Sequence, residues 1–167
     1  FKPPYKYDQI IEQSKKAGYD SLPIVSVVAL FIGFIFALQF GYFMQRIGSE
    51  MYIASLVALA IVRELGPVIT ALIVAGRVGA ANTAELGSMQ VTEQIDALET
   101  LATNPVKYLV VPRFVALGLM LPLLTLFADI VGILGSYLIC VVKLGITSSM
   151  YMNMTFSALL YKDLFTG

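Results

Sequence analysis

Charged residues that lie inside apolar stretches are the first candidates for chemistry in this sequence. Arg63 and Glu64 stand together in IVRELGPVITAL, residues 61–72, and Asp129 lies in LFADIVG. A charge at the centre of a membrane helix costs roughly 2.5 to 3.5 kcal/mol on insertion scales, so such residues mark functional or packing sites. These side chains could contact a polar group, pair with another charge, or carry a proton.

Two interpretations of the Arg-Glu-Leu-Gly-Pro block stay open. Adjacent helical residues point about 100° apart, so Arg63 and Glu64 pair well only if Gly66 and Pro67 loosen the helix. The block is then either a charge-neutral kink, or it faces a cavity between subunits and contacts a lipid head group or acts as a hinge. A proton relay would use Glu64 and Asp129, although an aspartate without histidine nearby is more often a hydrogen bonder in helix packing.

The composition is that of a membrane protein. The chain has 167 residues, of which 58% are hydrophobic and 13% charged, and its mean hydropathy is +0.82. Eleven basic and eleven acidic residues give no net charge, which does not favour nucleic-acid binding. With one cysteine, Cys140, and no histidine, an internal disulfide, a Cys/His zinc site and histidine-based catalysis are excluded. We expect no catalytic residue, no metal site and no cofactor in this chain.

Three apolar stretches meet the length of roughly 20 residues that a membrane-spanning helix needs. We expect spans at 24–44, 51–76 and 108–142. The third is long, and its Pro122 favours one tilted or kinked helix over a re-entrant pair. Because the chain starts at Phe1 rather than Met, we expect a fragment of a longer protein.

The lysines and arginines beside the spans predict the orientation. They place the N-terminus and residues 77–113 in the cytoplasm, and residues 143–167 on the other side as a segment leading to the next span. Residues 1–22 are either an amphipathic interfacial helix or a solvated leader. Arg77 is expected at the cytoplasmic end of the second span, anchored to head groups or to the acidic segment that follows.

The cytoplasmic segment 82–103 is predicted to form an amphipathic helix. Asn82 and Glu85 have the spacing of a capping box, and Asn104-Pro105 is a plausible stop. Glu93, Asp96 and Glu99 form an acidic side opposite an apolar side. Small residues at its entry have a spacing that lets membrane helices approach closely: Gly76, Gly79, Ala80, Ala81, Ala84 and Gly87. An exposed apolar strip flanked by charge favours a docking surface for a cytoplasmic protein, with a solvated loop helix as the alternative.

The stretch RELGPVITALIVAGRVGAANTAELGSMQVTEQIDALETLATNPVKYLVVPR resembles the corresponding region of MlaE-type permeases. These are the membrane subunits of ABC transporters that work with MCE-domain lipid-binding proteins. The matching pieces are Arg-Glu-Leu-Gly-Pro at 63–67, Ala-Gly-Arg at 75–77, Ala-Glu-Leu-Gly at 84–87, Thr-Glu-Gln-Ile-Asp-Ala-Leu at 92–98 and Pro-Arg at 112–113.

The resemblance implies an all-α integral membrane protein, with an N-terminal interfacial helix and about five membrane helices in the full protein, of which this fragment holds about three. It implies a homodimer in a bacterial inner membrane, with a chloroplast envelope as the alternative. A cytoplasmic ABC ATPase that binds ATP and Mg²⁺ and an MCE-domain protein are the implied partners, and phospholipid is the implied substrate, moved to maintain outer-membrane lipid asymmetry. This chain contains no Gly-x-x-x-x-Gly-Lys-Ser/Thr phosphate loop of its own.

The resemblance also assigns residues. The block at 63–67 would form the substrate-binding site or gate, through Arg63, Glu64, Gly66 and Pro67. The coupling helix that docks on the ATPase would use Glu85, Leu86, Gly87, Met89, Thr92, Glu93, Gln94, Asp96 and Leu98. The competing hypotheses are a proton-driven secondary transporter that uses Glu64 and Asp129, and a membrane scaffold that transports nothing.

Overall fold

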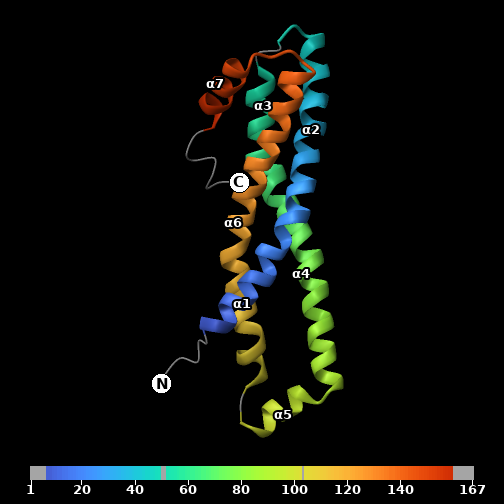
Figure 1. Ribbon diagram of the computed structural model, residues 1–167, viewed down its shortest axis with the longest axis vertical. Helices are drawn as coiled ribbons and strands as arrows, with labels where there is room; N and C mark the ends of the chain where they lie inside the picture. The colour runs from blue at the N-terminus through green and yellow to red at the C-terminus, as the bar shows by residue number, and fades with distance from the viewer. Residues whose placement is uncertain (1–6, 50–51, 103, 160–167) are drawn as a thin grey trace. The chain divides into compact units, whose positions relative to one another are not determined.

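A computed structural model describes residues 7–49, 52–102 and 104–159, and all regular structure within these ranges is helical. The elements are α1 (Tyr7–Ala17), η1 (Tyr19–Ser21), α2 (Leu22–Arg46), α3 (Ile53–Ala60), the π-helical η3 (Ile61–Leu65), α4 (Gly66–Val91), α5 (Gln94–Thr100), α6 (Pro105–Val142) and α7 (Ser148–Ala158) (Figure 1). The expectations for residues 1–6, 50–51, 103 and 160–167 lie outside the described residues.

Three helical stretches are long and apolar enough to cross a membrane: Gln9–Arg46, Ile53–Val91 and Pro105–Val142. This confirms the all-α fold with three candidate spans. The third stretch is the single continuous helix α6, which contains Pro112 and Pro122, and not a re-entrant pair.

The chain forms two compact units. The first unit comprises Phe1–Leu22 and Ala71–Leu123, and the second comprises Pro23–Thr70 and Leu124–Gly167. The long helices α4 and α6 are each continuous across the boundary in sequence. Each unit is described by itself below.

Small residues bring two helices of the second unit together. On α2 the buried positions recur every four residues, at Val25, Ala29, Gly33, Ala37 and Gly41. A Cβ added at Gly33 would overlap the carbonyl oxygen of Gly132 on α6, and one added at Gly135 would lie 2.6 Å from the carbonyl oxygen of Leu30. The backbones of α2 and α6 therefore approach as closely as glycine permits, which is how membrane helices gain packing energy.

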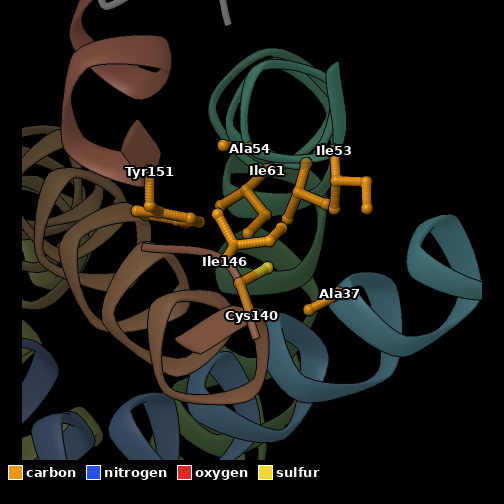
Figure 2. Packing of buried hydrophobic residues seen from close by; sticks show 8 residues of the cluster. Ala37, Ile53, Ala54, Ile61, Cys140, Ile146 and Tyr151 are labelled. Carbon is orange, nitrogen blue, oxygen red and sulfur yellow. The ribbon is translucent and has the colours of Figure 1, made fainter. Parts of the chain in front are cut away.

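The core of the second unit lies where α2, α3, α6 and α7 meet. Figure 2 shows side chains from these helices converging, with Tyr151 of α7 turned toward Ile61 and Ile146. The Tyr151 hydroxyl lies 2.5 Å from the Ser136 hydroxyl, and Ser55 Oγ donates to the Met154 carbonyl oxygen at 3.1 Å. These bonds satisfy polar groups inside an apolar cluster and fix α7 against α3 and α6.

In the first unit, α6 begins at an N-cap, whereas the sequence pattern at Asn104-Pro105 predicts a helix stop. Asn104 Oδ1 accepts hydrogen bonds from the backbone N–H groups of Val106 at 3.0 Å and Lys107 at 3.3 Å. Pro105 follows at the first helical position, where a missing N–H costs nothing. The preceding helix α5 has already ended at Thr100, so Asn104-Pro105 starts α6.

The predicted helix start at Asn82 is wrong. Asn82 lies inside α4, which runs without a break from Gly66 to Val91. An N-cap needs a non-helical backbone, and the surrounding alanines favour continued helix. The Thr83 hydroxyl instead donates to the Gly79 carbonyl oxygen one turn back, as a residue inside a helix does.

The glycines on α4 are not in close contact within the described chain. A Cβ added at Gly76, Gly79 or Gly87 would meet nothing within 4 Å. Close helix approach within the described chain is between α2 and α6, and the approach expected for the small residues of α4 stays a prediction.

Candidate functional site

The block at 63–67, which we call the gate block, disrupts its helix from within. Residues Ile61–Leu65 form a π-helical turn, and the Gly66 N–H donates to the Ile61 carbonyl oxygen five residues back. Pro67 explains the widening, because proline has no N–H for the Arg63 carbonyl and its ring crowds that oxygen. Such π-turns inside α-helices occur frequently at functional sites.

The two charged residues of the gate block point out of the second unit. Arg63 and Glu64 are exposed, whereas Ile61 and Val62 before them are each 2% exposed. The widened turn therefore presents both charges on the outside of this chain and keeps its apolar residues inside. Contact with a lipid head group stays a prediction.

Asp129 lies against the backbone of the gate block. A Cβ added at Gly66 would overlap the Asp129 carboxylate, so a side chain at position 66 would displace Asp129 from its place against the backbone. Asp129 is 4% exposed, and its Oδ1 has no hydrogen-bond partner among the described residues. The buried Thr70 hydroxyl, one turn after Gly66, also has none. The structure thus joins two features that the sequence presents separately, the gate block and the aspartate.

In the first unit, Glu85 is the centre of an ion-pair network. Its carboxylate lies 2.9 Å from Arg113 Nη2 of α6 and 3.5 Å from Lys16 Nζ of α1. Lys16 also lies 3.2 Å from Glu12 on its own helix. Glu85, which we assigned to ATPase coupling, therefore ties α1, α4 and α6 together within the chain.

Arg77 is fixed by the end of the N-terminal helix. Its Nη1 donates to the Ser21 hydroxyl at 2.8 Å and to the Lys16 carbonyl oxygen at 3.2 Å. Ser21 in turn donates to the Ala17 carbonyl oxygen at 2.7 Å. Arg77 thus anchors α4 to the junction of α1 and η1, a partner that the sequence did not indicate.

Three residues of this network were missed at the sequence level. Lys16 entered only among the charges that set the orientation, Arg113 entered as one of those charges and in the Pro-Arg match at 112–113, and Ser21 was not considered. Arg113 follows Pro112 inside an apolar run, and a buried arginine needs a carboxylate partner. The position of Arg113 in an apolar run could therefore have predicted an acidic partner, but nothing in the sequence identifies Glu85 as that partner.

The short helix α5 is held between two strained residues. Glu93 before it and Ala102 after it have left-handed backbones, with φ of 57° and 54°. This conformation costs a non-glycine residue roughly 1 to 2 kcal/mol. Such strain persists where the structure imposes it, and it clusters at functional sites.

The remaining predicted coupling residues divide between α4 and α5. The exposed ones are Gly87, Thr92, Glu93, Gln94 and Asp96, and the half-buried ones are Leu86, Met89 and Leu98. Since α4 ends at Val91, the single amphipathic helix predicted over 82–103 is in fact the end of one helix, a strained turn and a second helix. The exposed acidic side chains lie on the turn and on α5.

Comparison with known proteins assigns the chain to a family. Residues 10–167 match the family model described as Permease MlaE. The chain belongs to the MlaE permease family. This MlaE permease chain is similar to a probable ABC transporter permease protein of Rickettsia prowazekii, with 46% identity over 166 residues, which is 99% of the chain and 64% of the relative.

Two further relatives come from photosynthetic organisms. A probable ABC transporter permease protein of Synechocystis is 42% identical over 143 residues, covering 86% of the MlaE permease chain and 54% of the relative. The chloroplastic protein TRIGALACTOSYLDIACYLGLYCEROL 1 of Arabidopsis thaliana is 41% identical over 149 residues, which is 89% of the MlaE permease chain and 43% of the relative. The chain spans just under two thirds of the length of the first relative.

Proposed function

We propose that this chain forms part of the membrane subunit of an ABC transporter that moves phospholipid or a similar lipid. The subunit would act as a homodimer in a bacterial inner membrane and exchange lipid with an MCE-domain partner, thereby maintaining outer-membrane lipid asymmetry. A separate ATPase would bind ATP and Mg²⁺. Family membership, the relatives named as ABC transporter permeases and a chloroplastic relative named after a galactolipid support this proposal.

The strained connection around α5 is the observation that carries the proposal. A transporter driven by a separate ATPase needs a rigid docking element joined directly to its membrane helices. Helix α5 joins α4 to α6, is held at both ends by left-handed residues, and exposes Asp96 and Glu99. We therefore propose that the ATPase docks on residues 93–98. Glu85 would instead fix α4 to α1 and α6 through its ion pairs with Lys16 and Arg113.

The gate block would respond to the ATPase through α4. Its π-turn lies at the start of the same continuous helix whose other end leads into α5. A π-turn can convert to α-helix by shifting one hydrogen bond, which would rotate the exposed Arg63 and Glu64. In this proposal that rotation admits or releases the lipid head group.

The rival hypothesis of a proton-driven transporter rests on one observation. Asp129 is buried, lacks a partner for Oδ1, and contacts the gate block at Gly66. In the proposed function Asp129 serves instead as a packing residue that holds Gly66.

Reconstitution separates the two hypotheses. The full-length permease, with and without its co-purified ATPase, is placed in liposomes carrying fluorescent phospholipid. We expect transfer to an MCE-domain acceptor only with the ATPase and ATP. Transfer driven by a pH gradient without any ATPase would overturn the proposal. Glu64→Gln should slow transfer while the ATPase still co-purifies, and a loss of assembly would instead favour the kink interpretation.

A further inference from the structure

A groove opens between the N-terminal helix and α6 within the first unit. It has a volume of about 710 Å³. Its walls come from one side of α1 and η1 and from the middle of α6: Ile10, Ile11, Ser14, Lys15, Tyr19, Leu119 and Met120. Gly18 marks where the two elements touch, because an added Cβ there would lie 2.7 Å from Met120 Sδ.

The groove is apolar and uncovered. Ile11 is 67% exposed, Tyr19 68% and Leu119 56%. Large apolar side chains gathered at this exposure mark a binding surface. The first candidate membrane-spanning stretch, Gln9–Arg46, begins within α1, so the groove lies at one end of a candidate span.

The polar side of α1 is already occupied by the protein. Gln9, Glu12 and Gln13 line a separate cavity with Glu85 and Arg113. Lys16, on that side, pairs with both Glu12 and Glu85. Glu12 and Lys16 of α1 thus pair with one another, and Lys16 also pairs with Glu85 of α4, although Glu12 and Lys16 are still exposed. On the other side, Ile11 and Tyr19 are uncovered by the described residues.

Lys15 is the one charge among the described residues that line the groove. Lys15 is exposed, and its side chain makes no hydrogen bond or ion pair with any residue that the structure describes. The carboxylates near it in sequence do not neutralise it, because Glu12 pairs with Lys16 and Asp20 lies on η1 without a bond to Lys15. The groove is apolar, and the Lys15 ammonium group at its edge is not paired by a described residue. This combination suits an acyl chain attached to an anionic head group.

We propose that this groove is a binding site for an anionic phospholipid, with an acyl chain between Ile11 and Leu119 and the head-group phosphate on Lys15. The site is distinct from the gate block, and it does not depend on the proposed transport activity. It would hold α1 on the membrane by one bound lipid. A single lysine near an anionic lipid is expected to favour it over a zwitterionic lipid by roughly fivefold.

A tryptophan reporter tests the site, since the 167 residues contain no tryptophan. Leu119→Trp places the reporter in the groove, and Phe114→Trp places it at a 76% exposed position of α6 outside the groove. Both variants are built in the full-length permease, with any tryptophan outside these 167 residues replaced by phenylalanine. They are reconstituted in phosphatidylcholine with increasing amounts of phosphatidylglycerol brominated on its acyl chains. Brominated phosphatidylcholine serves as the reference quencher.

The expected result is selective quenching in the groove. Brominated phosphatidylglycerol should quench the Leu119→Trp reporter at a mole fraction about fivefold lower than brominated phosphatidylcholine, following the single-lysine preference. The Phe114→Trp reporter should show no preference. Adding Lys15→Gln to the Leu119→Trp variant should remove the preference, whereas Lys107→Gln, at an exposed lysine elsewhere on α6, should keep it.

Two results would overturn the proposal. One is equal quenching of the Leu119→Trp reporter by both lipids. The other is a preference that survives Lys15→Gln or is shared by the Phe114→Trp reporter, since either would reflect general attraction of anionic lipid to the protein. Glycerol phosphate in solution should not relieve the quenching, because it lacks the acyl chain, and relief would show a head-group site without the groove.

Discussion

Arg113 Nη2 lies 2.9 Å from Glu85 Oε2, and this pair joins α6 to α4 beside the N-terminal helix. The Arg113 side chain is only 9% exposed, whereas that of Glu85 is 39% exposed. Because Lys16 reaches the same carboxylate at 3.5 Å, one acid neutralises cations from two other helices. Glu85 is therefore better placed to hold the first unit together than to meet another protein.

Glu85→Gln should destabilise the protein. Removing this charge leaves the buried Arg113 without its carboxylate, which costs about 1 to 3 kcal/mol. Thermal unfolding of the full-length permease in detergent should show a lower midpoint. Glu99→Gln, at an exposed acid of α5 without an ion pair in the structure, is the matched control and should leave the midpoint unchanged. Equal midpoints for both variants would contradict the structural role of Glu85.

The three candidate spans were predictable from the sequence and the ion-pair network was not, for a physical reason. A span such as α2 is defined by local hydropathy, and its sequence carries no charge between Ile24 and Met44. The partners of Glu85 depend on which helices meet, and nothing local to Glu85 encodes Lys16 or Arg113. The same holds for Asp129, whose contact with Gly66 appears only once α4 and α6 have packed.

Two helix boundaries were predicted wrongly, because each local sequence pattern is compatible with more than one backbone conformation. Asn82 with Glu85 has the spacing of a capping box, but a cap forms only where the backbone leaves the helix, and α4 continues. Asn104-Pro105 could equally stop one helix or start the next, and the Asn104 side chain caps α6. The acidic pattern correctly predicted a helix in this region, which the structure places at Gln94–Thr100. Its acidic residues Glu93, Asp96 and Glu99 are exposed, as expected.

Gly33→Ala should destabilise the second unit, because the new methyl group meets the Gly132 carbonyl of α6, which is backbone and cannot turn away. Overpacking of this kind costs typically 1 to 3 kcal/mol. Gly79→Ala is the control: it has open space around it and should be neutral, or gain up to about 1 kcal/mol from helix propensity. Unfolding in a denaturing detergent titration measures the stability of both variants. A Gly33→Ala variant as stable as Gly79→Ala would contradict the close α2–α6 contact.

Pro67→Ala should stabilise the helix and slow transport. The alanine restores an N–H that can bond the Arg63 carbonyl, so the π-turn at Ile61–Leu65 can close into regular helix. Hydrogen exchange at the amides of this turn should become slower, and ATP-dependent lipid transfer should fall while ATPase binding persists. Unchanged transfer together with slowed exchange would show that the π-turn has no part in gating. Pro122→Ala, within α6, controls for general effects of removing a helix proline.

Charge reversal on α5 tests the docking site directly. Glu93 is the left-handed residue just before α5, and Asp96 lies in its first turn. Both are exposed, and neither forms an ion pair with a described residue. Glu93→Lys with Asp96→Lys places like charges against a basic partner surface, and losing about 1.4 kcal/mol of binding is a tenfold loss of affinity. We expect at least a roughly tenfold loss of ATPase co-purification and of ATP-dependent transfer, with normal membrane insertion. Asp20→Lys, an exposed acid on η1, is the control and should change neither. If the α5 double variant binds ATPase as tightly as the control, docking must lie outside residues 93–98, and the coupling proposal fails.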